Sequence, residues 1–388
     1  MGANALAIVH GGGPTAVINA SLYGAVTEAL AAPGVGRVLG ALGGVGGLAS
    51  GSFVDFSQVP EGRLGLLPSS PSSAIGTSRE PLDEEDYRAI ADALAHEGIR
   101  WLLCCGGNGT MDTCGRIWAA ARDAGIEVDV VGIPKTMDND LAAGDHAPGF
   151  ASAARYMAAS VADVCCDVRG LPIHICVVEA MGRNAGWVTA ASVLADESGT
   201  GGPDLVYVPE RPFDQVAFLD DCQRLIDERG CGVVVVSEGL HKADGTPVAP
   251  PLMEVGRARY FGDVSAHLAR LVVSELGYKA RSEKPGLLGR CSIAWQSEVD
   301  RDEAIECGAE AVRAALEGDS GTMTGIERVS DEPYASRVRR YPIADAMLTE
   351  RTLPDEYVNE RGNGVTDAYR RWLRPLIGRP LPRYVSFR

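Results

Sequence analysis

The segment that decides the fold is Ala5-Leu-Ala-Ile-Val9, followed by His10 and the glycine cluster Gly11-Gly-Gly-Pro-Thr15. A short apolar run without a clean period of two is typical of a strand buried on both faces of a parallel sheet. The next residues, 16–32, are rich in Ala and Leu and predict a helix. The segment therefore indicates a strand, a glycine turn and a helix, the repeating unit of an α/β protein.

The same pattern recurs along the chain. Further apolar runs predict strands at 101–105, 128–133, 173–179 and 232–237, with helical stretches between them. This alternation predicts an α/β fold of two doubly wound, Rossmann-like lobes with mostly parallel sheets. Because ligands in such folds bind beyond the carboxyl ends of the strands, we expect the active site there, in the cleft between the lobes.

Composition excludes several classes of function. The 388 residues carry 36 Lys and Arg against 52 Asp and Glu, a formal net charge of −16. This balance argues against nucleic acid, since a duplex binder neutralises phosphates with a basic patch. No apolar run reaches the ~18 to 20 residues of a membrane-spanning helix, and the first residues lack the pattern of a secretory signal. The ten cysteines form no Cys-x-x-Cys pair, which indicates reduced thiols. We expect a cytoplasmic protein without a membrane or nucleic-acid partner.

Glycines or charged residues follow each predicted strand. The glycine clusters 11–15 and 106–110 allow backbone N–H groups to approach an anion, because glycine lacks a Cβ atom. Asp138 and Asp140 stand near Lys135 after the third predicted strand. One carboxylate can take a proton from a substrate hydroxyl, and a second can hold Mg²⁺. Each feature alone could also be a tight turn or a helix cap, and their convergence at the strand ends favours a binding site.

In this order the motifs resemble those of the phosphofructokinase family over residues 5–345, with a tail similar to the longer, pyrophosphate-type branch. The resemblance is carried by the first phosphate loop Gly11-Gly-Gly-Pro-Thr-Ala-Val-Ile-Asn19, the arginine-bearing donor loop Gly76-Thr-Ser-Arg-Glu-Pro81, the second phosphate loop Gly107-Asn-Gly-Thr110, the catalytic segment Pro134-Lys-Thr-Met-Asp-Asn-Asp140 and the sugar-phosphate loop Met181-Gly-Arg-Asn-Ala-Gly-Trp187.

The resemblance implies a role for each of these positions. Asp138 would be the general base that deprotonates the attacking sugar hydroxyl, with Lys135 and Thr136 as further catalytic residues. The implied donor-binding residues are Gly12, Gly13, Arg79, Gly107, Gly109 and Thr110, and Asn108 is the implied metal residue, for Mg²⁺. The implied sugar-binding residues are Asp140, His174, Met181, Gly182, Arg183, Glu238, Arg281 and Arg290. Because a neighbouring subunit often contributes one of the last two arginines, the resemblance also implies a homodimer or homotetramer.

Two positions give opposite indications of the phosphoryl donor. Pyrophosphate users resemble Gly-Gly-Asp-Asp or Gly-Gly-Asn-Asp in the second loop, where the last acid crowds the place of the nucleotide α-phosphate. Here that position is Gly109, which leaves room for ATP. Lys135 is typical of pyrophosphate users, although some ATP users of the longer branch also carry it. The steric argument favours ATP.

Other departures concern the metal and the sugar. Asn108 replaces an aspartate that helps to hold Mg²⁺, and the missing charge weakens metal binding unless Asp138 or Asp140 compensates. His174 stands where the family often has an arginine; at pH 7 a histidine is mostly neutral, and a structural role is the alternative. We interpret His10, just before the first glycine loop, as a structural residue.

The sequence thus predicts a Mg²⁺-dependent 6-phosphofructokinase that transfers a phosphoryl group from ATP to the 1-hydroxyl of fructose 6-phosphate, giving fructose 1,6-bisphosphate. Three alternatives stay open: a reversible pyrophosphate-dependent enzyme, the same chemistry on another sugar phosphate such as sedoheptulose 7-phosphate, and a non-catalytic sensor with the same fold. We expect 1–143 with 294–345 to form the donor lobe, 144–293 the sugar-phosphate lobe, and 346–388 a tail that wraps the body.

Overall fold

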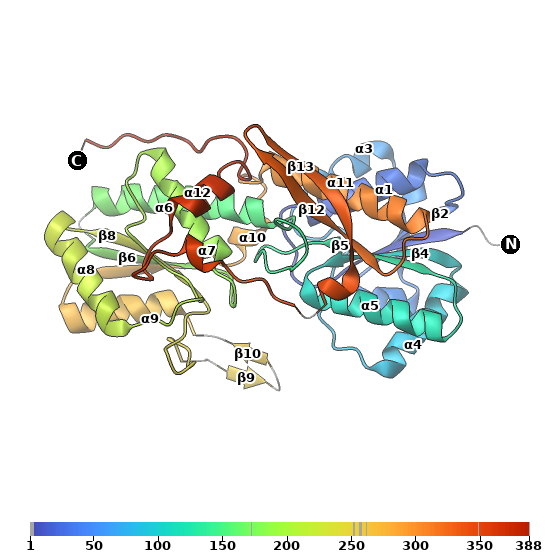
Figure 1. Cartoon of the computed structure of the whole chain (residues 1–388), viewed down its shortest axis with the longest axis horizontal. Helices are drawn as coiled ribbons and strands as arrows, with labels where there is room; N and C mark the ends of the chain where they lie inside the picture. Colours follow the sequence, from blue (N-terminus) through green and yellow to red (C-terminus); the bar gives the residue numbers. More distant parts are fainter. Residues whose placement is uncertain are drawn as a thin grey trace. The chain divides into compact units, whose positions relative to one another are not determined.

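The computed structural model describes residues 4–171, 173–250, 253–255, 258–260, 262–347 and 349–387. The chain divides into two compact units (Figure 1): unit 1 is Met1–Ser152 with Arg290–Arg351, and unit 2 is Ala153–Gly289 with Thr352–Arg388. The sequence placed these divisions at 143, 293 and 345. The first falls later because residues before Ser152 are tied to unit 1; the Thr136 amide, for example, donates to the carbonyl of Pro148 at 3.1 Å.

Unit 1 is built on a mixed sheet whose described strands are ordered β13-β12-β5-β4-β1-β2-β3. They are β1 (Ala5–His10), β2 (Arg37–Ala41), β3 (Phe53–Asp55), β4 (Ile99–Gly106), β5 (Asp129–Pro134), β12 (Thr322–Asp331) and β13 (Tyr334–Pro342). The five central strands run parallel, and β3 and β13 pair antiparallel at the two edges. Every residue of β1 is buried, as expected for a strand covered on both faces.

Helices pack on both faces of this sheet. Ala5, Ala7 and Val9 share a hydrophobic cluster with residues of α4 and α5, while Leu6 and Ile8 share another with residues of α1 and α11. The helices of unit 1 are α1 (Ile18–Ala31), α2 (Val45–Ser50), α3 (Glu61–Leu64), α4 (Glu84–His96), α5 (Asn108–Asp123) and α11 (Glu298–Leu316).

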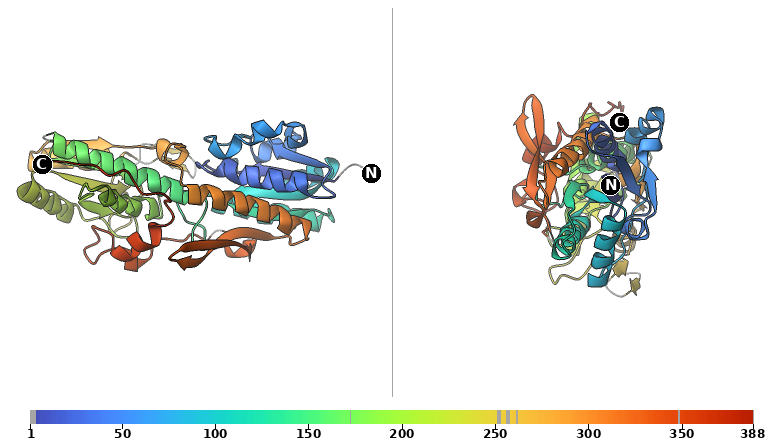
Figure 2. Two further views of the ribbon diagram at one scale, coloured as in Figure 1. Left: turned by 90° about the horizontal axis from the view of Figure 1, so that it is seen from above. Right: turned by 90° about the vertical axis from the view of Figure 1, so that its right-hand side faces the viewer.

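Helices α1 and α11 lie side by side in unit 1 (Figure 2). Glycines set their spacing: a Cβ atom on Gly24 would collide with the carbonyl of Ile305, and one on Gly308 with the carbonyl of Ser21. The two backbones therefore approach more closely than larger side chains would allow.

Unit 2 contains a parallel sheet in the order β11-β6-β8-β7 and a short antiparallel β9–β10 pair. Its strands are β6 (Ile175–Ala180), β7 (Leu205–Tyr207), β8 (Gly232–Ser237), β9 (Met253–Val255), β10 (Ala258–Tyr260) and β11 (Ala280–Glu283). Its helices are α7 (Trp187–Ala191), α8 (Gln215–Arg229), α9 (Val264–Leu271) and α12 (Asp367–Leu373); α6 (Phe150–Gly170) and α10 (Leu288–Cys291) span the unit boundaries.

The predicted fold class and the five predicted strands are confirmed, as β1, β4, β5, β6 and β8, and the helix predicted at 16–32 is α1. The last residues are more ordered than predicted. Residues 352–388 belong to unit 2, where Tyr357, Tyr369 and Trp372 surround Trp187 with ring centroids 5.0–6.2 Å away. Aromatic packing of this kind gives the segment a hydrophobic anchor that its prolines did not indicate.

Candidate active site

Three loops of unit 1 meet at the carboxyl edge of its sheet. Residues 11–15 follow β1, residues 107–110 follow β4, and residues 135–140 follow β5. Because β5, β4 and β1 are parallel neighbours, their carboxyl ends lie at the same edge. The structure therefore brings the two glycine clusters and the two predicted carboxylates together, in the place where doubly wound folds bind ligands.

Three cationic side chains converge on the first glycine loop. The Lys135 ammonium donates to the carbonyl of Gly13 at 2.6 Å. A Cβ atom on Gly13 would lie 2.8 Å from Nη1 of Arg290 and 2.9 Å from Nη2 of Arg79. Positive charge beside a glycine loop whose backbone a ligand can approach is a setting for phosphate groups. Arg290, predicted to bind the sugar, thus lies at the first glycine loop.

Lys135 is almost completely buried, with 3% of its surface exposed. Burial, and to a smaller extent the neighbouring Arg79, lowers the pKa of Lys135 to about 8, although Cys105 and Asp138 act in the opposite direction. A nearby anion favours the charged form of a buried cation. A phosphate bound beside Lys135 would therefore stabilise the protonated ammonium, which burial disfavours.

The backbone of the first loop is fixed to the donor loop. The hydroxyl of Thr77 donates to the carbonyl of Gly12 at 2.7 Å, and the Gly12 amide donates to the carbonyl of Ser78 at 3.0 Å. Gly12 has φ +73°, a conformation that favours glycine. Because these bonds join Gly12 to residues just before Arg79, the arginine is positioned by the loop that it serves.

His10 holds the other end of the donor loop. Its side chain is fully buried, and Nδ1 lies 2.8 Å from the hydroxyl of Ser73, which itself donates to the carbonyl of Gly76. Burial, followed by the charge of Lys135, lowers the pKa of His10 to about 3, so the ring is neutral. The structural role that we expected for His10 agrees with this geometry.

The second glycine loop begins a helix. α5 starts at Asn108, so Asn108, Gly109 and Thr110 belong to its first turn. Among the described residues, no atom lies within 4 Å of a Cβ atom built on Gly109. The side chain of Thr110, in contrast, packs so closely against Gly11 and Gly106 that a Cβ atom on either glycine would collide with it. Thr110 therefore contributes to packing between the strand ends.

The segment after β5 fixes the Asp140 carboxylate through both of its oxygens. The Thr136 hydroxyl accepts from the Asp138 amide at 3.1 Å and donates to Oδ1 of Asp140 at 2.8 Å. The Asn108 amide nitrogen donates to Oδ2 of Asp140 at 3.0 Å. Both oxygens of Asp140 thus accept hydrogen bonds, which suits an orienting role. Asp138 remains the residue that the family resemblance predicts as the base.

The same residues meet one requirement of a Mg²⁺ site. Oδ1 of Asn108 is buried without a hydrogen-bond partner in the part of the chain described, and amide and carboxylate oxygens are ligands that Mg²⁺ accepts. No cluster of three or more His, Cys, Asp or Glu side chains suited to a metal occurs among the described residues. This is compatible with Mg²⁺, which is usually held by one or two carboxylates together with substrate phosphates.

Unit 2 carries the remaining predicted residues in two separate groups. Met181, Gly182 and Arg183 follow β6, and Glu238 follows the adjacent parallel strand β8. The two loops touch: the Ser237 hydroxyl donates to the carbonyl of Gly182 at 2.6 Å. The structure therefore brings these four predicted sugar-binding residues to one edge of the sheet.

His174 and Arg281 lie toward the opposite end of β6. His174 immediately precedes β6, and Arg281 pairs in register with Cys176 near its start. At ~3.3 Å per residue, a strand of this length separates the two groups by roughly 20 Å. Nδ1 of His174 accepts from the Lys279 amide at 3.2 Å, a contact that fits the structural alternative for this residue.

Glycine loops and clustered cations at the carboxyl edge of a doubly wound sheet define a phosphate-handling α/β enzyme. The chain belongs to the phosphofructokinase family: the family model described as Phosphofructokinase matches residues 5–315. It is accordingly a phosphofructokinase-type phosphotransferase.

Similar proteins carry more than one name. The chain is 37% identical over 385 residues to pyrophosphate–fructose 6-phosphate 1-phosphotransferase of Rhodospirillum rubrum, covering 97% of this chain and 94% of that protein. It is 33% identical to sulfofructose kinase of Alkalicoccus urumqiensis, covering 97% and 96%. The crystal structure of pyrophosphate-dependent phosphofructokinase from Nitrosospira multiformis matches with a TM-score of 0.88 and 30% identity, covering 99% and 94%. Across the described residues, no helix is long and apolar enough to span a membrane.

Proposed function

We propose that this enzyme transfers a phosphoryl group from ATP to the 1-hydroxyl of fructose 6-phosphate in the presence of Mg²⁺. The observation that carries the choice of donor is the open space beside Gly109 in the first turn of α5. An acidic side chain at this position would place negative charge and bulk beside the phosphate loops. Glycine removes both, which favours a nucleotide with its additional α-phosphate.

The proposed roles follow from how each group is held. Asp138 accepts the proton of the attacking hydroxyl, while Asp140, fixed by Thr136 and Asn108, orients the segment. The cations at Gly13 stabilise the negative charge of the transferred phosphoryl group. Phosphoryl transfer depends on such positioning and charge stabilisation more than on covalent catalysis. Met181, Gly182, Arg183 and Glu238 bind the sugar.

Mg²⁺ would be held by the Asn108 amide oxygen and the Asp138 carboxylate together with donor phosphates. When bound, the ion neutralises charge on the phosphate oxygens. Asn108 supplies no charge, so we expect weaker metal binding than an aspartate at this position would give.

The second candidate is the pyrophosphate-dependent reaction. Lys135 at the first glycine loop favours it, because its ammonium is suited to a compact, highly charged donor. The names of the relatives from Rhodospirillum rubrum and Nitrosospira multiformis also favour it. The sulfofructose kinase relative suggests sulfofructose as a further alternative substrate, besides sedoheptulose 7-phosphate.

The position of His174 and Arg281 supports a homo-oligomer. Both lie roughly 20 Å from the Met181 loop along β6. If they bind the sugar phosphate, they therefore do so in the site of another subunit. Replacing Arg281 by Ala should raise the KM for the sugar. At a sugar concentration far below that KM, Arg281→Ala protein mixed with Asp138→Asn protein should regain activity as subunits exchange.

The deciding experiment compares kcat/KM for ATP and for pyrophosphate on the purified protein, with fructose 6-phosphate and Mg²⁺ held fixed. A preference for ATP supports the proposal, and a preference for pyrophosphate replaces it with the second candidate. Gly109→Asp should lower kcat/KM for ATP at least tenfold and spare pyrophosphate. Gly109→Ala is the matched control, because its Cβ atom enters open space without charge. If sulfofructose or sedoheptulose 7-phosphate is turned over and fructose 6-phosphate is not, that sugar replaces fructose 6-phosphate as the proposed substrate.

A further inference from the structure

A strained turn separates the two carboxylates of the catalytic segment. Asn139, between Asp138 and Asp140, has φ +55°, one of the few non-glycine residues of the described chain in the left-handed region. Such a conformation is unfavourable for a residue with a Cβ atom and persists only where the surroundings impose it. The direction in which Asp138 leaves the backbone therefore depends on whatever holds Asn139.

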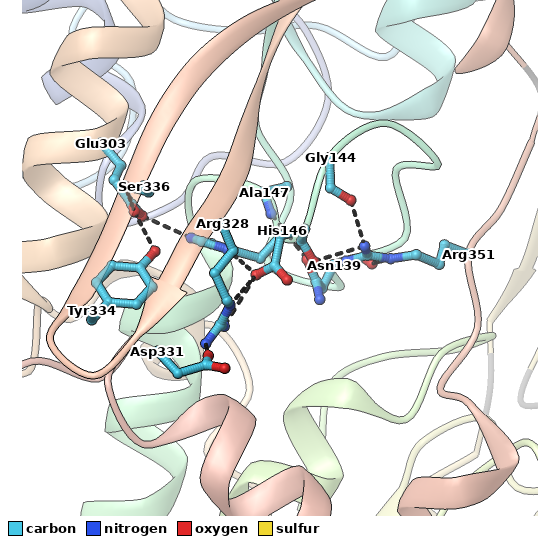
Figure 3. A network of polar contacts seen from close by, with 11 residues as sticks. Asn139, Gly144, His146, Ala147, Glu303, Arg328, Asp331, Tyr334, Ser336 and Arg351 are labelled. Carbon is cyan, nitrogen blue, oxygen red and sulfur yellow. Dashed lines mark hydrogen bonds and ion pairs between the residues drawn. The ribbon is translucent and has the colours of Figure 1, made fainter.

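Two groups hold this turn (Figure 3). The Asn139 side-chain oxygen accepts from the Ala147 amide at 3.0 Å. Arg351 donates through Nε to the carbonyl of Asn139 at 3.3 Å, and its own amide donates to the carbonyl of Asp140 at 2.8 Å. Ala147 is thus joined to the turn through the Asn139 side chain. Arg351 also ties the turn to the residues just before His146, since its Nη1 donates to the carbonyls of Gly144 and Asp145 at 2.9 and 2.7 Å.

Ala147 is in turn fixed by the residue before it. The His146 ring is fully buried, with Nδ1 2.8 Å from Oδ2 of Asp145 and Nε2 2.7 Å from Oε2 of Glu303. Glu303 belongs to α11, so this contact joins the loop to an element far away in sequence. Both ring nitrogens face carboxylates, which is the arrangement expected for a protonated histidine.

The two carboxylates have further partners on the β12–β13 hairpin (Figure 3). Arg328 of β12 donates through Nε and Nη2 to Oδ2 of Asp145, each at 3.1 Å. Tyr334 and Ser336 of β13 each donate to Oε1 of Glu303 at 2.6 Å. The loop, α11 and the hairpin therefore share one network around the buried pair His146 and Glu303. Removal of one member of this pair leaves the charge of the other poorly compensated.

We infer that His146 is a positioning residue for the phosphoryl-transfer reaction: held between Asp145 and Glu303, it fixes Ala147, and Ala147 fixes the Asn139 turn that aims Asp138. This inference rests on the proposed role of Asp138 as the base. Displacement of a catalytic group by about 1 Å can reduce the rate ~100-fold. A loss of His146 should therefore lower kcat and leave the KM values for donor and sugar nearly unchanged.

The test measures kcat and both KM values for wild type, His146→Gln and Tyr334→Phe at a temperature where all are folded. We expect kcat to fall about 10- to 100-fold in His146→Gln and severalfold in Tyr334→Phe, with KM changes below about twofold. Tyr207→Phe in unit 2 is the matched control: it also removes a buried tyrosine hydroxyl from a carboxylate, Oδ2 of Asp221 at 3.1 Å. Its kcat should not change.

A double-mutant cycle separates positioning from general loss of stability. Asn139→Gly removes the side-chain link to Ala147, and glycine adopts the turn without strain. For each background we compare the factor by which His146→Gln lowers kcat. If His146 acts through that link, this factor should be at least about five times smaller in the Asn139→Gly background than in wild type. If the factors by which the two substitutions lower kcat simply multiply in the double variant, the inference is overturned. It is also overturned if the kcat of His146→Gln and of Tyr334→Phe is unchanged, as expected for Tyr207→Phe. Wild-type turnover in the same assay judges the proposed function separately.

Discussion

Asp138 and Asp140 are two residues apart in sequence, and we propose different roles for them. Thr136 and Asn108 occupy both oxygens of Asp140. General-base catalysis by a positioned side chain typically contributes 10²- to 10⁴-fold. Asp138→Asn should lower kcat by about that factor and keep the thermal midpoint within a few degrees of wild type. Steady-state kinetics and a melting curve check both, and an unchanged kcat would remove Asp138 from the mechanism.

Lys135 makes donor use depend on pH. Burial lowers the pKa of Lys135 to about 8, and the charged form is the one that attracts phosphate. The kcat/KM for the donor, which reports the free enzyme, should therefore be constant below pH 8 and fall by up to tenfold per pH unit above it. Lys135→Met should have a lower kcat/KM throughout and lack this step. A wild-type profile without a step near pH 8 would contradict the assignment.

At the scale of elements, the contact between α11 and the loop before α6, made by Glu303 and His146, should stabilise the fold in a pH-dependent way. Burial alone lowers the pKa of His146, but Glu303 and Asp145 outweigh it and raise the pKa to about 9, from 6.5. Because the folded pKa is the higher one, the stabilisation is complete below pH 6.5 and is lost as pH rises through 9.

Melting curves of wild type and His146→Gln from pH 6 to pH 10 test this point. The two melting temperatures should differ most at pH 6 and converge above pH 9. At pH 6 the free energies of unfolding should differ by an amount on the order of a few kcal/mol. A difference that stays constant with pH would mean that His146 is not charged in the folded protein.

The close approach of α1 and α11 predicts a stability effect without any charge. Gly24→Ala should destabilise the protein by about 1–3 kcal/mol, because the added Cβ atom collides with the Ile305 carbonyl and forces the helices apart. Gly62→Ala in α3 is the matched control, since its Cβ atom meets no described atom within 4 Å. Chemical denaturation of both variants measures the difference, and equal stabilities would contradict the packing argument.

Much of this architecture could be predicted from the sequence. The apolar runs of β1, β4, β5, β6 and β8 are buried on both faces and carry a signal of their own, and the glycines or charged residues after them mark the strand ends. Strand β13 was missed because its residues alternate between exposed and half-buried positions and include several arginines.

The candidate site could be predicted only in part. Glycine and carboxylate motifs contiguous in sequence were found, whereas the convergence of Arg290 on Gly13 and the contact of His146 with Glu303 join residues far apart in the chain. No local pattern carries such contacts. The separation of His174 from Met181 likewise follows from strand length, which a motif spacing does not convey.

At the scale of the whole molecule, the last residues complete unit 2. The guanidinium of Arg155, 2% exposed, donates to the carbonyls of Ile377 and Arg379. A chain ending at Arg351 would leave this charge and the Trp187 ring without those partners, a loss comparable to breaking a buried ion pair, ~3–5 kcal/mol. We expect such a truncation to abolish soluble, active protein. A chain ending at Tyr384 should behave like wild type, because Val385 and Phe387 are 76% and 97% exposed. Expression and tryptophan fluorescence distinguish the two truncations.

The division of the chain also constrains how the protein is made. Unit 1 is interrupted by unit 2, and unit 2 is closed by the final segment, Thr352–Arg388. A ribosome adds ~5–20 residues per second, so the nascent sheet of unit 2 waits seconds or longer for the residues that cover Trp187. During that interval its apolar surface is open to other chains. Biosynthesis of this enzyme should consequently depend on holding factors that act until Thr352–Arg388 has been synthesised.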